Sequence, residues 1–285
     1  MHRFAVVLAG ATLFLLFVGA MVTSTGSGLA TPDWPLPDGQ LLPPMRGEMF
    51  FEHGHRLVAA AVGLLTIVLS VGLILREERR WVRTLGIAAL AAVVGQGLLG
   101  MLTVKLGLSA VVSIVHAGLS QLFFALIVTL AVVTSRRWLA GPETAQDPKL
   151  ATRAALLASA IYLQILFGAI YRHTSEALVL HLLGAVVVTV LAVLALGAAT
   201  GRLRRVAWIV IGLLCGQLLL GAGALTVVST GVVKQIEAPL FNAVILSLHL
   251  VTASAMLAHG MILTLHSFRG FAARSSQLAL AEARP

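Results

Sequence analysis

Eight long apolar stretches run through this 285-residue chain and limit what it can fold into. A helix rises about 1.5 Å per residue, so each stretch is long enough to cross a hydrocarbon core of about 30 Å. The stretches lie at roughly residues 4–24, 51–75, 84–104, 110–134, 151–171, 178–198, 205–227 and 240–266. We therefore expect an all-α polytopic membrane protein with eight transmembrane helices.

The composition excludes two other classes of protein. Only 11% of the residues are charged, against roughly 25% in soluble domains, so the chain has too little polar surface for a soluble enzyme. Outer-membrane barrels are built from alternating segments of about ten residues, and the apolar runs here are longer and continuous. The single cysteine, Cys215, lies in an apolar run, which rules out an intrachain disulfide.

The basic residues predict how the chain is oriented in the membrane. If the N-terminus is cytoplasmic, 15 of the 20 Lys and Arg residues fall on the cytoplasmic side, as the positive-inside rule requires. This asymmetry accounts for the net charge of +9, so we expect no nucleic-acid partner. The first stretch is longer than the core of a cleaved signal peptide, and no Arg- and Ser-rich presequence precedes it. We expect a bacterial plasma-membrane protein with both termini in the cytoplasm.

Two similar motifs indicate an internal repeat. GQGLLG at residues 95–100 and GQLLLG at residues 216–221 agree at five of six positions, and Leu-Thr-Val follows each shortly afterwards. We predict two parallel-repeat four-helix bundles, an N-terminal half (residues 1–140) and a C-terminal half (residues 141–285). The first motif also matches the dinucleotide pattern GxGxxG, but that pattern follows a strand, whereas this one lies within an apolar helix.

Four histidines occupy equivalent places in the two halves. His55 and His181 open the second helix of each half, and His116 and His249 lie in the fourth. Two imidazoles facing each other across an apolar bundle suit the two axial positions of a haem iron. Zinc would need three or four clustered ligands, and a proton relay would need histidines at staggered depths. A hydrogen-bonded packing role is the alternative for each histidine alone.

Only the N-terminal half carries a carboxylate beside its first histidine. Glu52 precedes His55 by three residues and shares its helix face, while Leu178 takes that place in the C-terminal half. Glu52 could exchange protons with a reacting group, or it could form an ion pair with Arg56. Arg56 and Arg172, both predicted at the outer surface, could pair with haem propionates or anchor the chain at the interface.

Several ordered segments together resemble the haem A synthase family. They are residues 25–29 (TGSGL), residues 32–36 (PDWPL), residues 52–56 (EHGHR), residues 172–174 (RHT) and the four histidines. Many members of the family carry a cysteine pair that flanks the PDWPL segment. Thr31 and Pro37 stand there in this chain, so no thiol role is expected of that loop.

The resemblance implies an oxidoreductase that converts a methyl group of haem O into a formyl group, giving haem A for respiratory terminal oxidases. It implies that His55 and His116 are the axial ligands of the substrate haem O, with Glu52 catalytic. His181 and His249 would be the axial ligands of a cofactor haem b and its iron. Haem O synthase, an electron acceptor such as quinone, and membrane lipid are the expected partners.

Two other functions are open to the same sequence. A di-haem b-type electron-transfer protein that handles quinol would use the same four histidines but would give Glu52 no special chemistry. A haem-free transporter with parallel repeats would need polar groups near the bilayer midplane. The histidines here lie toward the outer face of the membrane instead.

Overall fold

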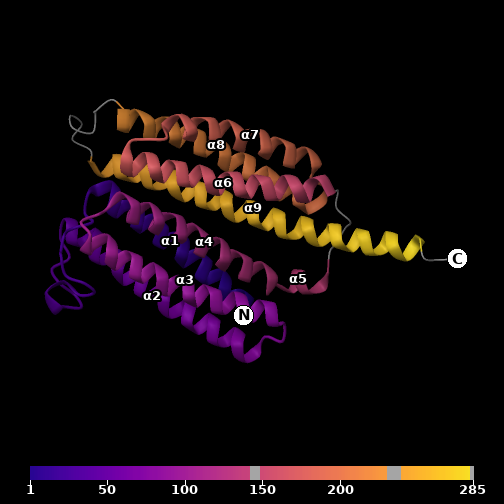
Figure 1. Ribbon diagram of the computed structural model, residues 1–285, viewed down its shortest axis with the longest axis horizontal. Coiled ribbons are helices and arrows are strands. Elements are labelled where there is room, and N and C mark those ends of the chain that lie inside the picture. Colours follow the sequence, from indigo (N-terminus) through magenta and orange to yellow (C-terminus); the bar gives the residue numbers. More distant parts are fainter. Residues whose placement is uncertain (142–147, 230–238, 283–285) are drawn as a thin grey trace.

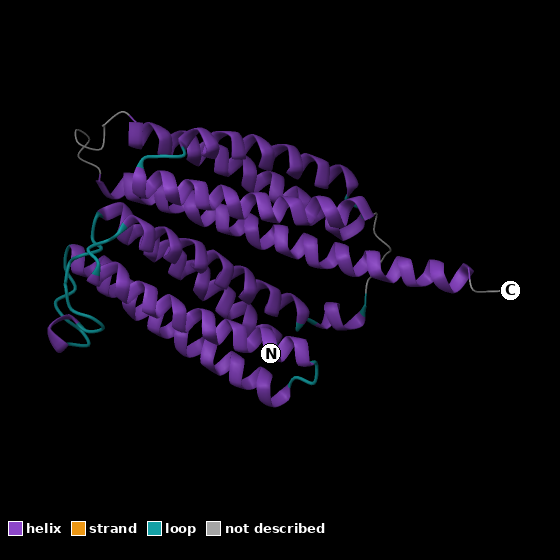
Figure 2. Cartoon of the chain, viewed as in Figure 1, coloured by secondary structure: helices purple, strands orange, loops and turns teal. Residues whose placement is uncertain are grey.

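The computed structural model describes residues 1–141, 148–229 and 239–282, and these residues form helices and no strand. Figures 1 and 2 show the helices lying side by side along one direction. The elements are α1 (His2–Thr25), the 3-10 turn η1 (Pro37–Gly39), α2 (Glu48–Arg76), α3 (Arg80–Lys105), α4 (Ala110–Val133), α5 (Arg136–Ala140), α6 (Pro148–Thr174), α7 (Leu178–Ala198), α8 (Gly201–Ser229) and α9 (Pro239–Glu282).

The predicted membrane helices are confirmed. In the described residues, eight helices are long and apolar enough to cross a membrane: α1 to α4 and α6 to α9. Their bounds agree with the predicted ones within a few residues, except that α9 continues beyond residue 266 to Glu282. No proline follows residue 266 until the chain end, so nothing in that sequence forces the helix to stop.

The first helix of each predicted half ends in a left-handed residue. α1 is followed by Gly26 (φ 72), whose backbone N–H donates back to Thr23, and α6 is followed by Ser175 (φ 63). A left-handed residue is the usual way to satisfy the last carbonyl groups of a helix. The segments that follow α1 and α6 lie at the same end of the molecule (Figure 1).

The helix contacts form two groups of four. α1, α2, α3 and α4 contact one another in a ring, and α6, α7, α8 and α9 do the same. The groups meet through α1 and α4 on one side and α6 and α9 on the other. This grouping follows the division of the chain at residue 140; that the two groups are repeats stays a prediction.

Each group has its own apolar core, and a small third cluster joins them. One core includes Leu8, Leu69 and Ile127, and the other includes Leu157 and Met256. The third cluster consists of Leu16, Phe124, Val128 and Ala258, from α1, α4 and α9. Since lipid tails are as apolar as these side chains, close packing between helices holds such cores together.

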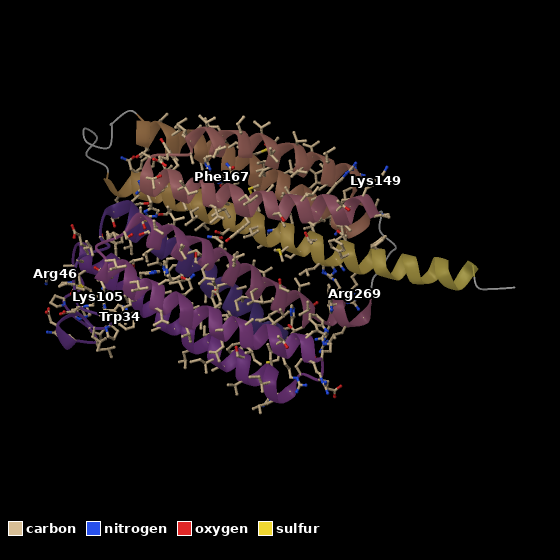
Figure 3. The ribbon with its side chains drawn as sticks, in the orientation of Figure 1. Trp34, Arg46, Lys105, Lys149, Phe167 and Arg269 are labelled. Carbon is tan, nitrogen blue, oxygen red and sulfur yellow. The ribbon has the colours of Figure 1, made fainter. Side chains whose placement is uncertain are left out.

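The two ends of the molecule differ in what they carry. Figure 3 shows Trp34, Arg46 and Lys105 gathered at one end, where the loop between α1 and α2 lies. Lys149 and Arg269 lie toward the opposite end (Figure 3). We call the first the outer end and the second the inner end, after the predicted orientation.

Candidate haem-binding sites

His181 and His249 face each other across the C-terminal group of helices. Their ring centroids are 6.3 Å apart and the rings are inclined by 69°. A histidine nitrogen binds a metal at about 2 Å, and a ring centre lies about 1 Å behind that nitrogen, so two rings on one metal have centres about 6 Å apart. The observed separation therefore leaves room for one iron between the two rings.

A glutamine residue lies beside each of the two rings. The Gln164 side chain donates from Nε2 to the backbone oxygen of His181 at 2.6 Å, and His181 Nδ1 lies 3.1 Å from the backbone oxygen of Gln164. With its N–H directed at that carbonyl group, the His181 ring keeps Nε2 available as a ligand atom. Gln217 Nε2 lies 3.3 Å from Nε2 of His249, beside the atom that an iron would bind.

A glycine lies against each of the four histidine rings. A Cβ added to Gly168 would meet the His181 ring at 3.0 Å, and one added to Gly221 would meet the His249 ring at 3.1 Å. The N-terminal group repeats the arrangement. There, Cβ atoms on Gly19 and Gly100 would meet the His55 ring at 3.0 Å and the His116 ring at 3.7 Å.

His55 and His116 form the corresponding pair in the N-terminal group. They are close enough to interact electrostatically, and the side chain of Gln96 donates to the backbone oxygen of His116 at 3.1 Å. Within the described part of the chain, Nδ1 of His55, His116 and His249 is buried without a hydrogen-bond partner. Nδ1 of His53 is buried and unpaired in the same way.

The residues present fit a haem at each pair. Haem iron takes two axial ligands from a protein such as this, and each helix group offers two half-buried imidazoles on facing helices. The glycines remove side-chain volume next to the rings, and the surrounding helix faces are apolar. Both groups therefore have the ligands and the lining that a bis-histidine haem requires.

Glu52 lies buried at the outer end of α2, with only 4% of its surface exposed. Its Oε2 accepts a hydrogen bond from the backbone N–H of Thr31 at 3.2 Å, and its Oε1 pairs with the guanidinium of Arg56. Both carboxylate oxygens are thus occupied. The ion pair that the sequence left as an alternative is present, and it does not exclude proton exchange.

Arg56 also holds the PDWPL segment. Its Nη1 donates to the backbone oxygens of Asp33 at 2.6 Å and Pro35 at 3.3 Å. The guanidinium therefore joins Glu52 to the loop between α1 and α2. Its predicted pairing with a haem propionate is not tested by these contacts.

His53 and Lys105 fasten the same loop, which sequence reasoning did not foresee. His53 is 1% exposed and its Nε2 lies 2.8 Å from the backbone oxygen of Leu41, while Lys105 Nζ donates to the backbone oxygen of Pro32 at 3.1 Å. His53 and His55 are two residues apart on α2, and side chains at this spacing do not lie on the same helix face. This spacing could have indicated from the sequence that His53 has a different role from His55.

Arg172 and two further histidines, His259 and His266, make contacts of their own. Arg172, at the outer end of α6, donates to the backbone oxygen of Thr23 at 3.2 Å and so links the two helix groups. Toward the inner end, Nδ1 of His259 lies 2.8 Å from the oxygen of Ala255 in its own helix. His266 lies edge-on against Trp138, with ring centroids 5.7 Å apart.

Comparison with known proteins shows a similarity to one family. A family model described as "Cytochrome oxidase assembly protein", COX15-CtaA, matches residues 46–183. That segment contains Glu52, His55, His116 and His181, whereas His249 lies outside it.

Curated relatives point the same way. The protein named "Heme A synthase" of Geobacillus kaustophilus is 32% identical over 178 residues, which cover 59% of this chain and 55% of the relative. That of Shouchella clausii is 32% identical over 183 residues, covering 62% of this chain and 61% of the relative. The matched segment thus spans between half and two thirds of each relative's length. With Glu52 and three of the four histidines inside the matched segment, the chain is similar to the COX15-CtaA family of cytochrome oxidase assembly proteins over residues 46–183.

Proposed function

We propose that this protein is a haem A synthase, which oxidises a methyl group of haem O to a formyl group. The observation that carries the proposal is a pair of histidines in each helix group, each ring against a glycine, with a buried carboxylate three residues before the first histidine in only one group. The names of the relatives support this chemistry over quinol-dependent electron transfer.

The N-terminal half is the proposed substrate site. His55 and His116 bind the iron of haem O there, and Glu52 lies three residues before His55 on the same helix face. Leu178 and Leu182 replace Glu52 and Arg56 at the matching positions of α7. Because oxidation of a methyl group removes protons as well as electrons, the half that has a buried carboxylate is the one equipped for it.

Glu52 is the proposed proton acceptor. An ionised carboxylate offers acceptor lone pairs only, and the contacts with Arg56 and the Thr31 N–H hold its two oxygens in place. The loop that Arg56, His53 and Lys105 hold over this end separates Glu52 from bulk water. Glu52 can therefore accept a proton near the substrate while Arg56 keeps the carboxylate oriented.

The C-terminal half is the proposed cofactor site. His181 and His249 would hold a haem b there, which when bound supplies one-electron transfer. The backbone oxygen of Gln164 orients the His181 imidazole through Nδ1, in the way that outer groups fix the ligands of metal sites, whereas Gln217 lies beside Nε2 of His249 and would give up that atom to the iron.

The proposed setting follows from the distribution of charge. The protein spans the bacterial plasma membrane with both termini in the cytoplasm, receives haem O from a haem O synthase and passes electrons to an acceptor such as quinone. The histidine pairs then lie toward the outer leaflet.

Pigment analysis tests the proposed function. The protein is expressed together with a haem O synthase in a host that makes no haem A, and the haems extracted from the membranes are separated by chromatography. We expect haem A only when this protein is present. Two equivalents of bound haem b, with supplied haem O left unconverted, would instead identify an electron-transfer protein.

A further inference from the structure

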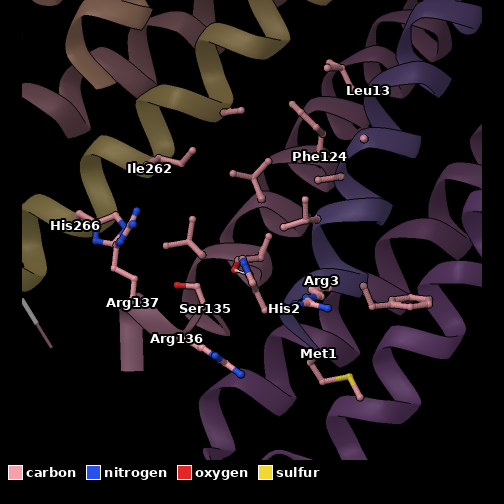
Figure 4. A pocket seen from close by; sticks show the side chains of 18 residues that line it. Met1, His2, Arg3, Leu13, Phe124, Ser135, Arg136, Arg137, Ile262 and His266 are labelled. Atoms are coloured by element: carbon pink, nitrogen blue, oxygen red, sulfur yellow. Dashed lines mark hydrogen bonds between the residues drawn. The ribbon is translucent and has the colours of Figure 1, made fainter. Parts of the chain in front are cut away.

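A pocket of about 1250 Å³ lies at the inner end of the molecule, between the two helix groups. It is lined by residues of α1, α4, α5 and α9 (Figure 4). Leu13, Phe124 and Ile262 form an apolar wall, and Arg3 and Arg136 lie at its rim. The pocket is closer to the inner end than the histidine pairs are, and its deep end at Leu13 lies six residues before Gly19, the glycine against the His55 ring.

The depth of the pocket corresponds to one leaflet of a membrane. Arg3 and Leu13 are ten residues apart on α1, which at about 1.5 Å per residue is about 15 Å. The hydrocarbon core is about 30 Å thick, so the pocket reaches from a helix end to about the bilayer midplane. A lipid acyl chain has this reach.

The rim of the pocket is strongly basic. The described residues that line it include Arg3, Arg136 and Arg137 and no Asp or Glu. Glu77, near the same end, is already paired with Arg79 at 2.7 Å, and the pairing holds the pKa of its carboxyl group below the usual range. The protein therefore presents positive charge next to an apolar wall, an arrangement that an anionic headgroup with a hydrocarbon tail complements.

We propose that this pocket binds an anionic phospholipid. The phosphate lies between Arg3 and Arg136, and one acyl chain runs along Leu13, Phe124 and Ile262. A quinone carries no negative charge to match the rim. A porphyrin bound here would contact none of the four paired histidines, because the described residues that line the pocket do not include them.

Such a lipid would also fill space and make van der Waals contacts between the two helix groups. Leu13, Phe124 and Ile262 belong to, or pack against, the small cluster that joins the groups. A void beside this cluster leaves its side chains without partners on one side. The acyl chain supplies those contacts, so the bound lipid strengthens the junction between the halves.

Lipid binding by the purified full-length chain tests the proposal. After delipidation, the protein is titrated in mixed micelles with phosphatidylglycerol or with phosphatidylcholine, and bound lipid is counted by native mass spectrometry. We expect at least about tenfold tighter binding of phosphatidylglycerol, given two arginines near one phosphate. The double variant Arg3→Gln/Arg136→Gln should lose this preference, whereas Arg76→Gln/Arg80→Gln, which removes the same charge from exposed sites outside the pocket, should keep it.

A second variant tests whether the acyl chain occupies the pocket and leaves the basic residues unchanged. A Cβ on Gly10, which lines the pocket, meets nothing within 4 Å, so Gly10→Leu fills the pocket without a clash. It should weaken binding of both lipids, and Gly212→Leu, at an equally open position on α8, should not. Equal binding of the two lipids by the wild-type chain, or unchanged binding in both pocket variants, would overturn the proposal. So would loss of a bound porphyrin, in place of lipid, in those variants.

Discussion

Glu52 differs from the four histidines in where its partners come from. The histidines lie against glycines of neighbouring helices, whereas Glu52 is held by Arg56 one turn along α2 and by the backbone of Thr31 in the loop. A group held in this way is sensitive to loss of its charge and insensitive to small changes in helix packing. Its role can therefore be separated from haem binding.

The variant Glu52→Gln should separate proton transfer from haem binding. The amide keeps an acceptor oxygen for Thr31 but loses the charge that Arg56 pairs with, and a positioned proton acceptor commonly contributes 10²-fold or more. We expect haem A production to fall by about that factor while the haem content stays unchanged, both read from extracted pigments. Glu48→Gln, an exposed carboxylate in the first turn of α2, is the control and should be fully active.

The glycines opposite the histidine rings should tolerate no side chain. A methyl group on Gly168 or Gly221 would meet a histidine ring at about 3 Å, so the ring would have to move. Groups that orient metal ligands commonly contribute 10-fold to 100-fold in affinity, and we expect haem retention in Gly168→Ala to drop by about tenfold. Absorption spectra of the purified variant measure it, and wild-type retention would show that the ring has room to adapt. Gly212→Ala, where a Cβ meets nothing within 4 Å, serves as the matched control.

At the scale of elements, the loop between α1 and α2 is the least regular part of the site and is nevertheless firmly held. Four side chains from α2 and α3 bind its backbone: Glu52, His53, Arg56 and Lys105. The 3-10 turn η1 is the only helical segment among residues 26–47, all of them described. The loop owes its position over Glu52 to these contacts with helices.

Removal of His53 should release the loop more than removal of Lys105. His53 is buried, and its loss removes the bond to the Leu41 carbonyl group, which contributes about 0.5–1.5 kcal/mol. Lys105 is exposed, so its bond to Pro32 contributes less. Limited proteolysis near the exposed Leu41 and Leu42 should be clearly faster in His53→Leu and nearly unchanged in Lys105→Met. Equal rates in the two variants would mean that the loop is held by other contacts.

The membrane helices were predictable because each leaves a long apolar signal, and the loop was not. Helices and facing histidines follow from length and from the repeated GQGLLG and GQLLLG motifs. The contacts of His53 with Leu41 and of Arg56 with Asp33 join residues through irregular chain, where no periodicity relates sequence to space. The contacts of Gly19 and Gly168 with histidine rings were also not predicted. The sequence held a signal for them, because each glycine is followed by Ala and lies at the same distance from the end of its helix.

At the scale of the whole molecule, two groups of four helices carry out different parts of one reaction in the proposed function. The groups share a layout of histidines and glycines but differ at Glu52 and Leu178. They meet through α1, α4, α6 and α9, so a substrate site and a cofactor site lie in adjoining bundles. The pocket between the groups could not be predicted from sequence, because it arises from how the helices pack.

The central claim is that each group binds one porphyrin between its own pair of histidines. The haem content of His55→Ala and His181→Ala, purified after expression with a haem O synthase, tests it most directly. We expect His181→Ala to lose haem b and keep haem O, and His55→Ala to lose haem O and keep haem b. If either variant retains both haems, or if both variants lose the same one, the two pairs are not separate binding sites.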